Sequence, residues 1–129
     1  MTEIERRYLA RIADPAVLER ARVSRIRQGY LSAGEPAVRV RERETDGDFA
    51  YTLTVKAGRG VIRREVEVPI DADAGLALME MAGRRVLEKL RHVVGRWEID
   101  VFQGKLTGLT LAEVELDHPR EVVPAPVGL

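Results

Sequence analysis

The chain contains no cysteine among its 129 residues and only two histidines, His92 and His118. The missing cysteines exclude disulfide bonds and thiolate zinc sites. Any metal site must therefore be built mainly from carboxylates, which suit hard cations such as Mg²⁺, Mn²⁺ and Ca²⁺.

The sequence also lacks an excess of charge of either sign, because 21 acidic residues balance 21 basic ones. Generic binding to nucleic acid or to an anionic membrane needs a net basic surface. No stretch approaches the run of about 18 apolar residues that crosses a membrane. The N-terminus begins with charges at positions 3, 5, 6 and 7 and has no apolar signal segment. We therefore expect a soluble, cytoplasmic protein with no nucleic-acid or membrane partner.

Aromatic residues are scarce, at 5%, whereas charged residues make up 33% of this short chain. Most of the sequence alternates between apolar and polar residues, which is typical of β-strands. A short helix is expected after Asp14, with Pro15 at its first position, and a second from an Asp73 cap through Met81 to near Gly83. The expected strands are 3–9, 23–31, 37–44, 49–57, 61–70, 88–94, 96–104 and 110–116.

The number of strands predicts the fold. Residues 1–129 are expected to form one domain, mainly β with short helices, either a closed antiparallel eight-stranded barrel or a strongly curved sheet. A barrel of eight strands has a bore just wide enough for side chains or for one small ligand. Asp46-Gly47 and residues 58–60 fit hairpin turns, and residues 119–129, with three prolines, are expected to be irregular.

Charged side chains share one face of most of these strands and segregate by sign. Acidic pairs occur at 3/5, 65/67 and 113/115, and basic pairs at 39/41 and 89/91. Like charges on neighbouring positions repel unless an opposite charge lies between them. Acidic pairs therefore favour a divalent cation, and basic pairs favour a phosphate chain. The alternative is an ordinary sheet with a solvated face, and the spacing alone leaves both interpretations open.

Several short motifs follow one another along the chain. EIERRYL at 3–9 is close to Glu-x-Glu-x-Lys followed by an aromatic residue, and IRQGYL follows at 26–31. The further motifs are VRVR at 38–41, LTVK at 53–56, REVEVPI at 64–70, Lys89 with Arg91, WEIDVFQGKLTGL at 97–109 and AEVEL at 112–116. In this order the motifs resemble the CYTH, or triphosphate tunnel metalloenzyme, family over about residues 3 to 116. The QGYL segment is similar to that of short bacterial inorganic tripolyphosphatases.

The resemblance implies an eight-stranded tunnel that hydrolyses a small-molecule triphosphate with Mg²⁺ or Mn²⁺. The substrate that it implies most directly is inorganic tripolyphosphate, which would be hydrolysed to pyrophosphate and phosphate. The metal ligands that it implies are Glu3, Glu5, Asp100, Glu113 and Glu115. The phosphate-binding residues that it implies are Arg7, Arg39, Arg41, Lys56, Arg63, Lys89 and Arg91. Catalytic roles would fall on Arg7, Tyr30, Glu65 and Glu67. Barrel packing is the alternative for Tyr30, and the two glutamates would alternatively order the basic residues or bind a second metal.

Other members of the family keep further functions open. These are a thiamine triphosphatase, a class IV adenylyl cyclase and a catalytically weak or idle module that binds polyphosphate or nucleotides. The scarcity of aromatic residues favours a naked polyphosphate, because organic groups are commonly bound by stacking. Arg7 replaces the lysine of the family motif, and the C-terminal segment of the family is expected to be missing after about residue 118. A monomer or a homodimer is expected.

Overall fold

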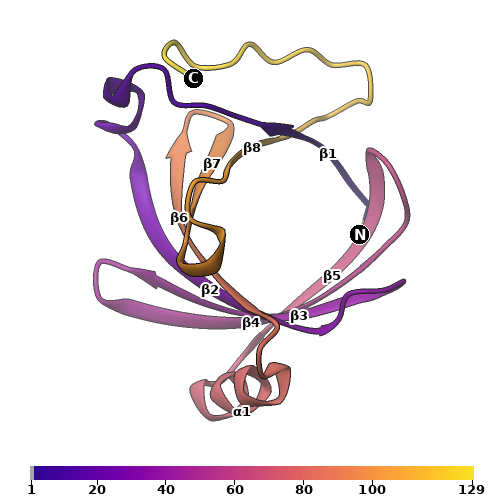
Figure 1. Ribbon diagram of the computed structural model, residues 1–129. Helices are drawn as coiled ribbons and strands as arrows, with labels where there is room; N and C mark the ends of the chain where they lie inside the picture. The colour runs from indigo at the N-terminus through magenta and orange to yellow at the C-terminus, as the bar shows by residue number, and fades with distance from the viewer. Residues whose placement is uncertain (1) are drawn as a thin grey trace.

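The computed structural model describes residues 2–129, which form a closed barrel of eight antiparallel strands (Figure 1). Neighbouring strands follow the order β1-β5-β4-β3-β2-β6-β7-β8 around the barrel. The predicted fold class is therefore confirmed. The strands are β1 (Thr2–Leu9), β2 (Arg22–Ser32), β3 (Ala37–Thr45), β4 (Asp48–Ala57), β5 (Ile62–Ile70), β6 (Val86–Val94), β7 (Trp97–Gln103) and β8 (Thr110–Glu115).

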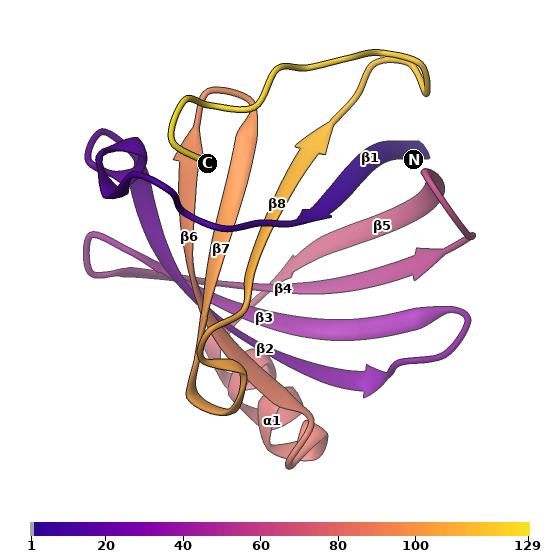
Figure 2. The same ribbon diagram turned by 45° about the horizontal axis from the view of Figure 1, so that its top comes forward.

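Each strand predicted from the alternation is present, with ends shifted by a few residues at most. The strands form two meanders, β2 to β5 and β6 to β8, and β1 closes the barrel between β5 and β8 (Figure 2). Asp46 and Gly47 form the tight turn between β3 and β4, both with positive φ, as an Asp-Gly hairpin turn requires.

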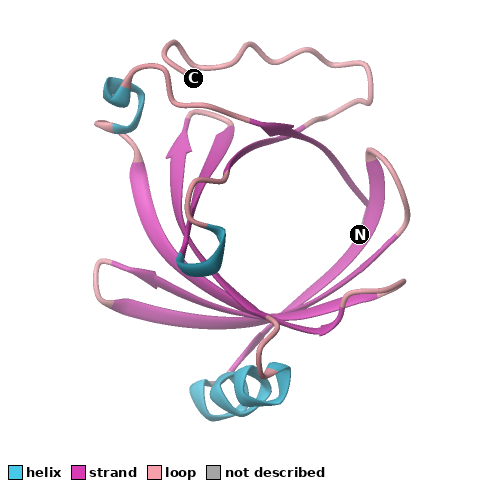
Figure 3. Ribbon diagram, viewed as in Figure 1, coloured by secondary structure: helices cyan, strands magenta, loops and turns pink. Residues whose placement is uncertain are grey.

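Three short helical segments interrupt the strands (Figure 3). They are the 3₁₀ turns η1 (Pro15–Leu18) and η2 (Gly104–Leu106) and the helix α1 (Ala72–Ala82). Asp14 caps η1 as predicted, by accepting a hydrogen bond from the Ala16 amide at 3.0 Å. The predicted cap of α1 was wrong. Asp71 caps it, accepting from the Ala74 amide at 2.8 Å, and Asp73 lies in the first turn.

The helix α1 packs against the outside of β2, β3 and β4 (Figure 1). Two glycines allow this close approach. A Cβ on Gly75 would lie 2.3 Å from the Tyr51 ring, and a Cβ on Gly29 would lie 2.7 Å from the Ala82 Cβ. Gly75, Met79 and Ala82 form the buried side of the helix.

The C-terminal segment covers another part of the outer wall, across β1 and β8 (Figure 2). It is irregular, as predicted, but it is well anchored: the Trp97 indole donates to the Pro124 carbonyl at 2.8 Å, and Leu129 packs against the Trp97 cluster. The buried Trp97, Ile99 and Met79 are core residues. Apolar side chains are thus buried mainly outside the barrel, which leaves its bore to charged ones. Within residues 2–129, no helix has the length and apolar character that a membrane crossing requires.

Candidate active site

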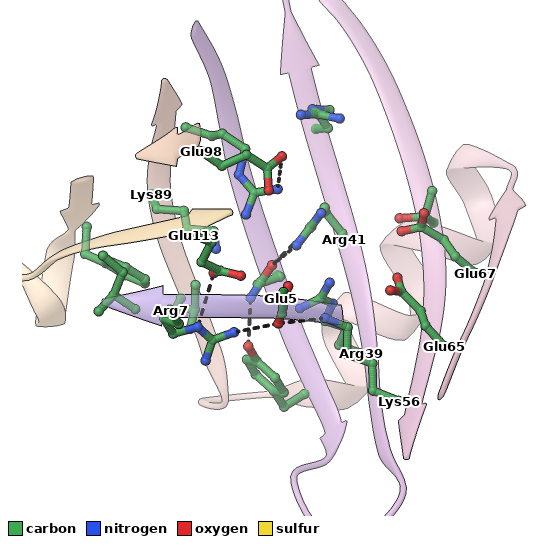
Figure 4. A pocket seen from close by; sticks show the side chains of 18 of the residues that line it. Glu5, Arg7, Arg39, Arg41, Lys56, Glu65, Glu67, Lys89, Glu98 and Glu113 are labelled. Atoms are coloured by element: carbon green, nitrogen blue, oxygen red, sulfur yellow. Dashed lines mark hydrogen bonds and ion pairs between the residues drawn. The ribbon is translucent and has the colours of Figure 1, made fainter. Parts of the chain in front are cut away.

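The bore contains a cavity of about 510 Å³ whose wall is built largely from charged side chains. Seven cationic and six acidic residues line it, so charges of both signs are concentrated at one place. Figure 4 shows these side chains converging from opposite walls. The predicted site residues that line the cavity are Glu3, Glu5, Arg7, Tyr30, Arg39, Arg41, Lys56, Glu65, Glu67, Lys89, Arg91 and Glu113.

Glu5 on β1 lies at the centre of an ion-pair cluster. Its Oε1 is 3.7 Å from Arg7 Nη2, 3.8 Å from Lys56 Nζ and 3.9 Å from Arg63 Nη1. Lys56 also bonds Glu3 at 3.1 Å. The period-two spacing of β1 places Glu3, Glu5 and Arg7 on the inner face, and β4 supplies Lys56 from a neighbouring wall.

Arg7 links this cluster to β8. Its Nε lies 3.3 Å from Glu113 Oε1, directly across the β1–β8 pair (Figure 4). Burial lowers the pKa of Arg7, but the charges of Glu113 and Glu5 outweigh burial and raise it above its ordinary value. Arg7 is therefore a permanent cation that bridges two predicted metal ligands.

One specific observation indicates that the carboxylates of this cluster fit a divalent cation. Glu5 Oε1 is buried and accepts no hydrogen bond within residues 2–129, although three cations lie near it. A buried anionic oxygen without a hydrogen bond is costly, so a ligand that binds it is favoured. Residues 2–129 hold no group of three His, Asp or Glu side chains already arranged as a metal centre. The carboxylates of this cluster are instead engaged in ion pairs with Arg7 and Lys56.

Asp100 on β7 lies beneath a second set of cations, which β6 supplies. Lys89 Nζ is 2.6 Å from its Oδ2, and Arg91 donates to both of its oxygens at 2.9 Å. Burial raises the pKa of Asp100, but Arg91 and Lys89 outweigh it and hold the pKa below its usual range. Asp100 is fully buried beneath these contacts, so its role as a metal ligand stays a prediction.

Three arginines on the inner face of β3 form a row along the cavity: Arg39, Arg41 and Arg43. None of the ion pairs found in residues 2–129 includes a member of this row. The Nε atoms of Arg39 and Arg43 are buried and have no hydrogen-bond partner there. Burial lowers the pKa of Arg41, and the neighbouring Arg39 and Arg91 lower it further. These guanidinium groups are therefore left to bind an anion that enters the bore.

Glu65 and Glu67 of β5 face the cavity from the wall opposite Lys89 and Glu113 (Figure 4). Thr54 on β4 donates to Glu67 at 3.1 Å. Tyr30 of β2 also lines the cavity, and its hydroxyl accepts a hydrogen bond from Gln28 at 2.7 Å. Tyr30 therefore faces the cavity with a hydrogen-bonded hydroxyl and does more than pack in the barrel wall.

Comparison with known proteins bears on this site. No protein-family model matches the chain. The inorganic triphosphatase of Nitrosomonas europaea is 33% identical to it, over 98% of this chain and 85% of the relative. The inorganic triphosphatase of Acetivibrio thermocellus is also 33% identical, over 96% of this chain and 80% of the relative. The chain belongs to the inorganic triphosphatase family. The resemblance found in its motifs is thereby confirmed.

Solved structures agree with this membership. The crystal structure of the inorganic triphosphatase NE1496 matches 96% of this chain and 84% of its own, with 30% identity and a TM-score of 0.59. The PH1819 protein from Pyrococcus horikoshii OT3 matches 88% of this chain and 76% of its own, with 20% identity and a TM-score of 0.62. At that identity the second match shows the fold alone.

Three predicted residues of this triphosphatase-family chain do not line the main cavity. Arg63 lies at one mouth of the bore, in a neighbouring hollow of about 400 Å³ with Arg59. Asp100 lies behind Lys89 and Arg91, as described above. Glu115 is exposed at the end of β8, opposite Glu5 in the strand pair. The roles predicted for these residues remain predictions.

Polar residues that line the cavity and escaped prediction include Gln28, Arg43 and Glu98. Arg43 continues the alternation of Arg39 and Arg41, and Glu98 shares a strand face with Asp100, so the same pattern could have identified both. Glu98 is opposite Glu113 on β8 and 3.3 Å from Arg91. Gln28 lies within the QGYL segment, but an uncharged residue is not selected by a search for charge pairs.

Proposed function

We propose that this chain hydrolyses inorganic tripolyphosphate to pyrophosphate and phosphate, with Mg²⁺ or Mn²⁺ as the cofactor. The observation that carries the proposal is the cavity itself, where seven cationic and six acidic side chains line about 510 Å³. Family membership supports the same function, since the relatives from Nitrosomonas europaea and Acetivibrio thermocellus are named inorganic triphosphatases.

The mixture of charges argues for a metal-bound polyanion over a free one. The arginine row would attract a phosphate chain, but the six carboxylates would repel it. A divalent cation held by these carboxylates would offset that repulsion and would supply charge neutralisation and a polarised water. Glu3, Glu5 and Glu113 are the residues proposed to hold it, because Lys56 links Glu3 to Glu5, Arg7 links Glu113 to Glu5, and Glu5 Oε1 lacks a hydrogen bond.

The protein's own contribution would be positioning and neutralisation, as in other phosphoryl transfers. Arg39, Arg41 and Lys89 would hold the phosphate oxygens, the arginines through paired N–H groups. Arg7 would neutralise charge on the phosphoryl group under attack. Glu65 and Glu67 would face the attacking water from the opposite wall and accept its proton. The water oxygen forms a bond to the terminal phosphorus while the bridging oxygen leaves with pyrophosphate.

The lining favours a naked polyphosphate over a nucleotide or thiamine triphosphate. Tyr30 and Phe102 are the aromatic residues that line the cavity within residues 2–129. Phe102 is covered by Lys89, whose Nζ lies 5.3 Å from the ring centre, and Tyr30 is hydrogen-bonded through its hydroxyl. Little aromatic surface is left to stack on an organic group. A cytoplasmic location and a monomeric or homodimeric state remain predictions from the sequence.

The deciding experiment is a phosphate-release assay with tripolyphosphate, ATP and thiamine triphosphate, each with Mg²⁺, with Mn²⁺ and with EDTA. Glu5→Gln tests the metal site, and Glu44→Gln is the matched control, because Glu44 lies on the outer face of β3 and does not line the cavity. We expect release from tripolyphosphate that requires a divalent cation, is lost in E5Q and is kept in E44Q. Tight, salt-sensitive binding of tripolyphosphate without release would instead identify an idle binding module and overturn the proposal.

A further inference from the structure

Gln28 on β2 is an uncharged polar side chain beside the centre of the arginine row. It is 2% exposed and lies directly opposite Arg41 in the β2–β3 pair. Its Oε1 accepts two hydrogen bonds from Arg41, from Nε at 3.1 Å and from Nη2 at 3.0 Å. Because a guanidinium can only donate, these bonds fix which end of the amide faces Arg41.

The other end of the amide reaches Tyr30. Gln28 Nε2 donates to the Tyr30 hydroxyl at 2.7 Å, and the oxygen of that hydroxyl is therefore an acceptor in this contact. The hydroxyl hydrogen remains free to donate to a ligand in the cavity that Tyr30 lines. A single buried amide thus orients two donor groups toward the same space.

The neutrality of Gln28 distinguishes it from the partners of the other buried cations. Arg91 and Lys89 share the carboxylate of Asp100, and Lys56 pairs with Glu3. Arg41 is 9% exposed, yet no carboxylate lies within ion-pair distance of it in residues 2–129. Its orientation is therefore fixed without any loss of its charge, whereas a carboxylate at the same place would fix it and cancel the charge.

We infer that Gln28 is a positioning residue that holds Arg41 and Tyr30 as paired phosphate donors while leaving the Arg41 charge uncompensated for the substrate. The inference rests on the proposed function. Its particular claim is that the neutrality of the amide matters as well as its hydrogen bonds. A merely structural role makes the opposite prediction for a glutamate at this position, because the stronger hydrogen bonds of a carboxylate would only improve the packing.

The test compares wild type with Gln28→Glu, which has nearly the same shape. The dissociation constant of tripolyphosphate is measured by calorimetry in EDTA, kcat and KM are measured with Mg²⁺, and the melting temperature is measured without ligand. We expect Q28E to bind tripolyphosphate at least tenfold more weakly and to raise KM, while its melting temperature is equal to or above that of wild type. Gln103→Glu is the matched control. It adds the same negative charge as Q28E, but Gln103 does not line the cavity.

Gln28→Met keeps the size of the side chain but removes its hydrogen bonds to Arg41 and Tyr30. It replaces Q28E as the test if Q28E fails to fold. We expect Q28M to bind tripolyphosphate several-fold more weakly, with a lower melting temperature. Wild-type affinity in Q28E, or in Q28M if Q28E is unfolded, would overturn the inference while leaving the proposed function intact. A wild-type protein that neither binds nor hydrolyses tripolyphosphate would overturn both.

Discussion

Lys89 and Asp100 form a short ion pair inside the barrel, with 2.6 Å between Lys89 Nζ and Asp100 Oδ2. The side chain of Lys89 is 5% exposed and that of Asp100 is fully buried. Arg91 completes the group through two hydrogen bonds to the same carboxylate. Glu98 also lies 3.3 Å from Arg91, so two carboxylates balance the two cations, and Lys89 depends on Asp100 for its ion pair.

Asp100→Asn should destabilise the protein by about 3 kcal/mol, because it removes the charged partner of the buried Lys89 and leaves Arg91 with Glu98 alone. Added tripolyphosphate should restore part of the loss, since its oxygens can replace the missing carboxylate. Urea unfolding with and without tripolyphosphate measures both effects. Asp48→Asn is the control, because Asp48 is exposed at the start of β4.

The same variant separates two roles of Asp100. If it mainly orients Lys89 and Arg91, the affinity of the ligand-free protein for Mn²⁺ should be unchanged in D100N when titrated by calorimetry. A loss of Mn²⁺ binding with unchanged stability would instead support the metal-ligand role that the family resemblance implies.

The pH dependence of binding should follow Lys89. Burial lowers its pKa to about 8 and outweighs the opposing effect of Asp100. Above that pH the ammonium loses its proton, so the affinity for tripolyphosphate in EDTA should fall, by up to tenfold per pH unit. The stability of the free protein should change in the opposite direction. Between about 8 and the ordinary lysine pKa of 10.5, the unfolded chain holds the proton and the folded one does not, so stability rises with pH.

Lys89→Arg is the control for this pair of trends, because a guanidinium stays protonated over the whole range. Calorimetric titrations and urea unfolding are compared between pH 7 and pH 10 (roughly the window between the two pKa values). In K89R, both the fall in affinity and the rise in stability that Lys89 causes in wild type should be absent. An unchanged fall in affinity in K89R would assign the pH dependence to another group.

The strands and the inward-facing charges could be predicted from the sequence because both depend on local alternation. Arg39 and Arg41 face the bore for the same reason that Val40 does not, since successive side chains of a strand point to opposite faces. Interactions between strands could not be predicted in this way. The pairing of Arg91 with Asp100, and of Gln28 with Arg41, depends on the register of two strands, which the alternation leaves open.

The start of α1 shows the same limit at a smaller scale. Asp71 and Asp73 have the same side chain and are both suitable caps from local sequence. In the structure Asp71 is the cap and directly follows Ile70, the last residue of β5, so the helix begins where the strand ends. The end of that strand depends on its pairing with β4, which the local sequence does not show.

Arg7→Lys tests the main departure from the family motif. The guanidinium contacts Glu113 and Glu5 together, at 3.3 and 3.7 Å, and therefore competes with a cation for their oxygens. An ammonium is a more compact charge and does not reproduce this forked contact. We expect the Mn²⁺ concentration for half-maximal phosphate release to fall several-fold in R7K, and kcat to rise about tenfold, which corresponds to about 1.4 kcal/mol of transition-state stabilisation.

Arg6→Lys is the neighbouring control for that substitution, because Arg6 bonds the Pro119 carbonyl and does not line the main cavity. Metal titrations of phosphate release on both variants make the comparison. An R7K protein with the metal requirement of wild type would show that Arg7 does not compete with the cation.

Gly29→Ala tests why the QGYL segment places a glycine beside Gln28. The new Cβ would lie 2.7 Å from the Ala82 Cβ of α1, a distance that forces the helix away from the sheet. Overpacking of this kind costs about 1–3 kcal/mol, measurable by urea unfolding. The double variant G29A/A82G should recover much of that loss, because Ala82→Gly removes the opposing methyl group, although a glycine at the end of the helix costs up to about 1 kcal/mol itself. A double variant no more stable than G29A would show that the contact with Ala82 is not the cause.

Since Gly29 directly follows Gln28, G29A should also weaken tripolyphosphate binding if the displaced strand moves the Gln28–Arg41 pair, whereas G29A/A82G should bind as wild type does.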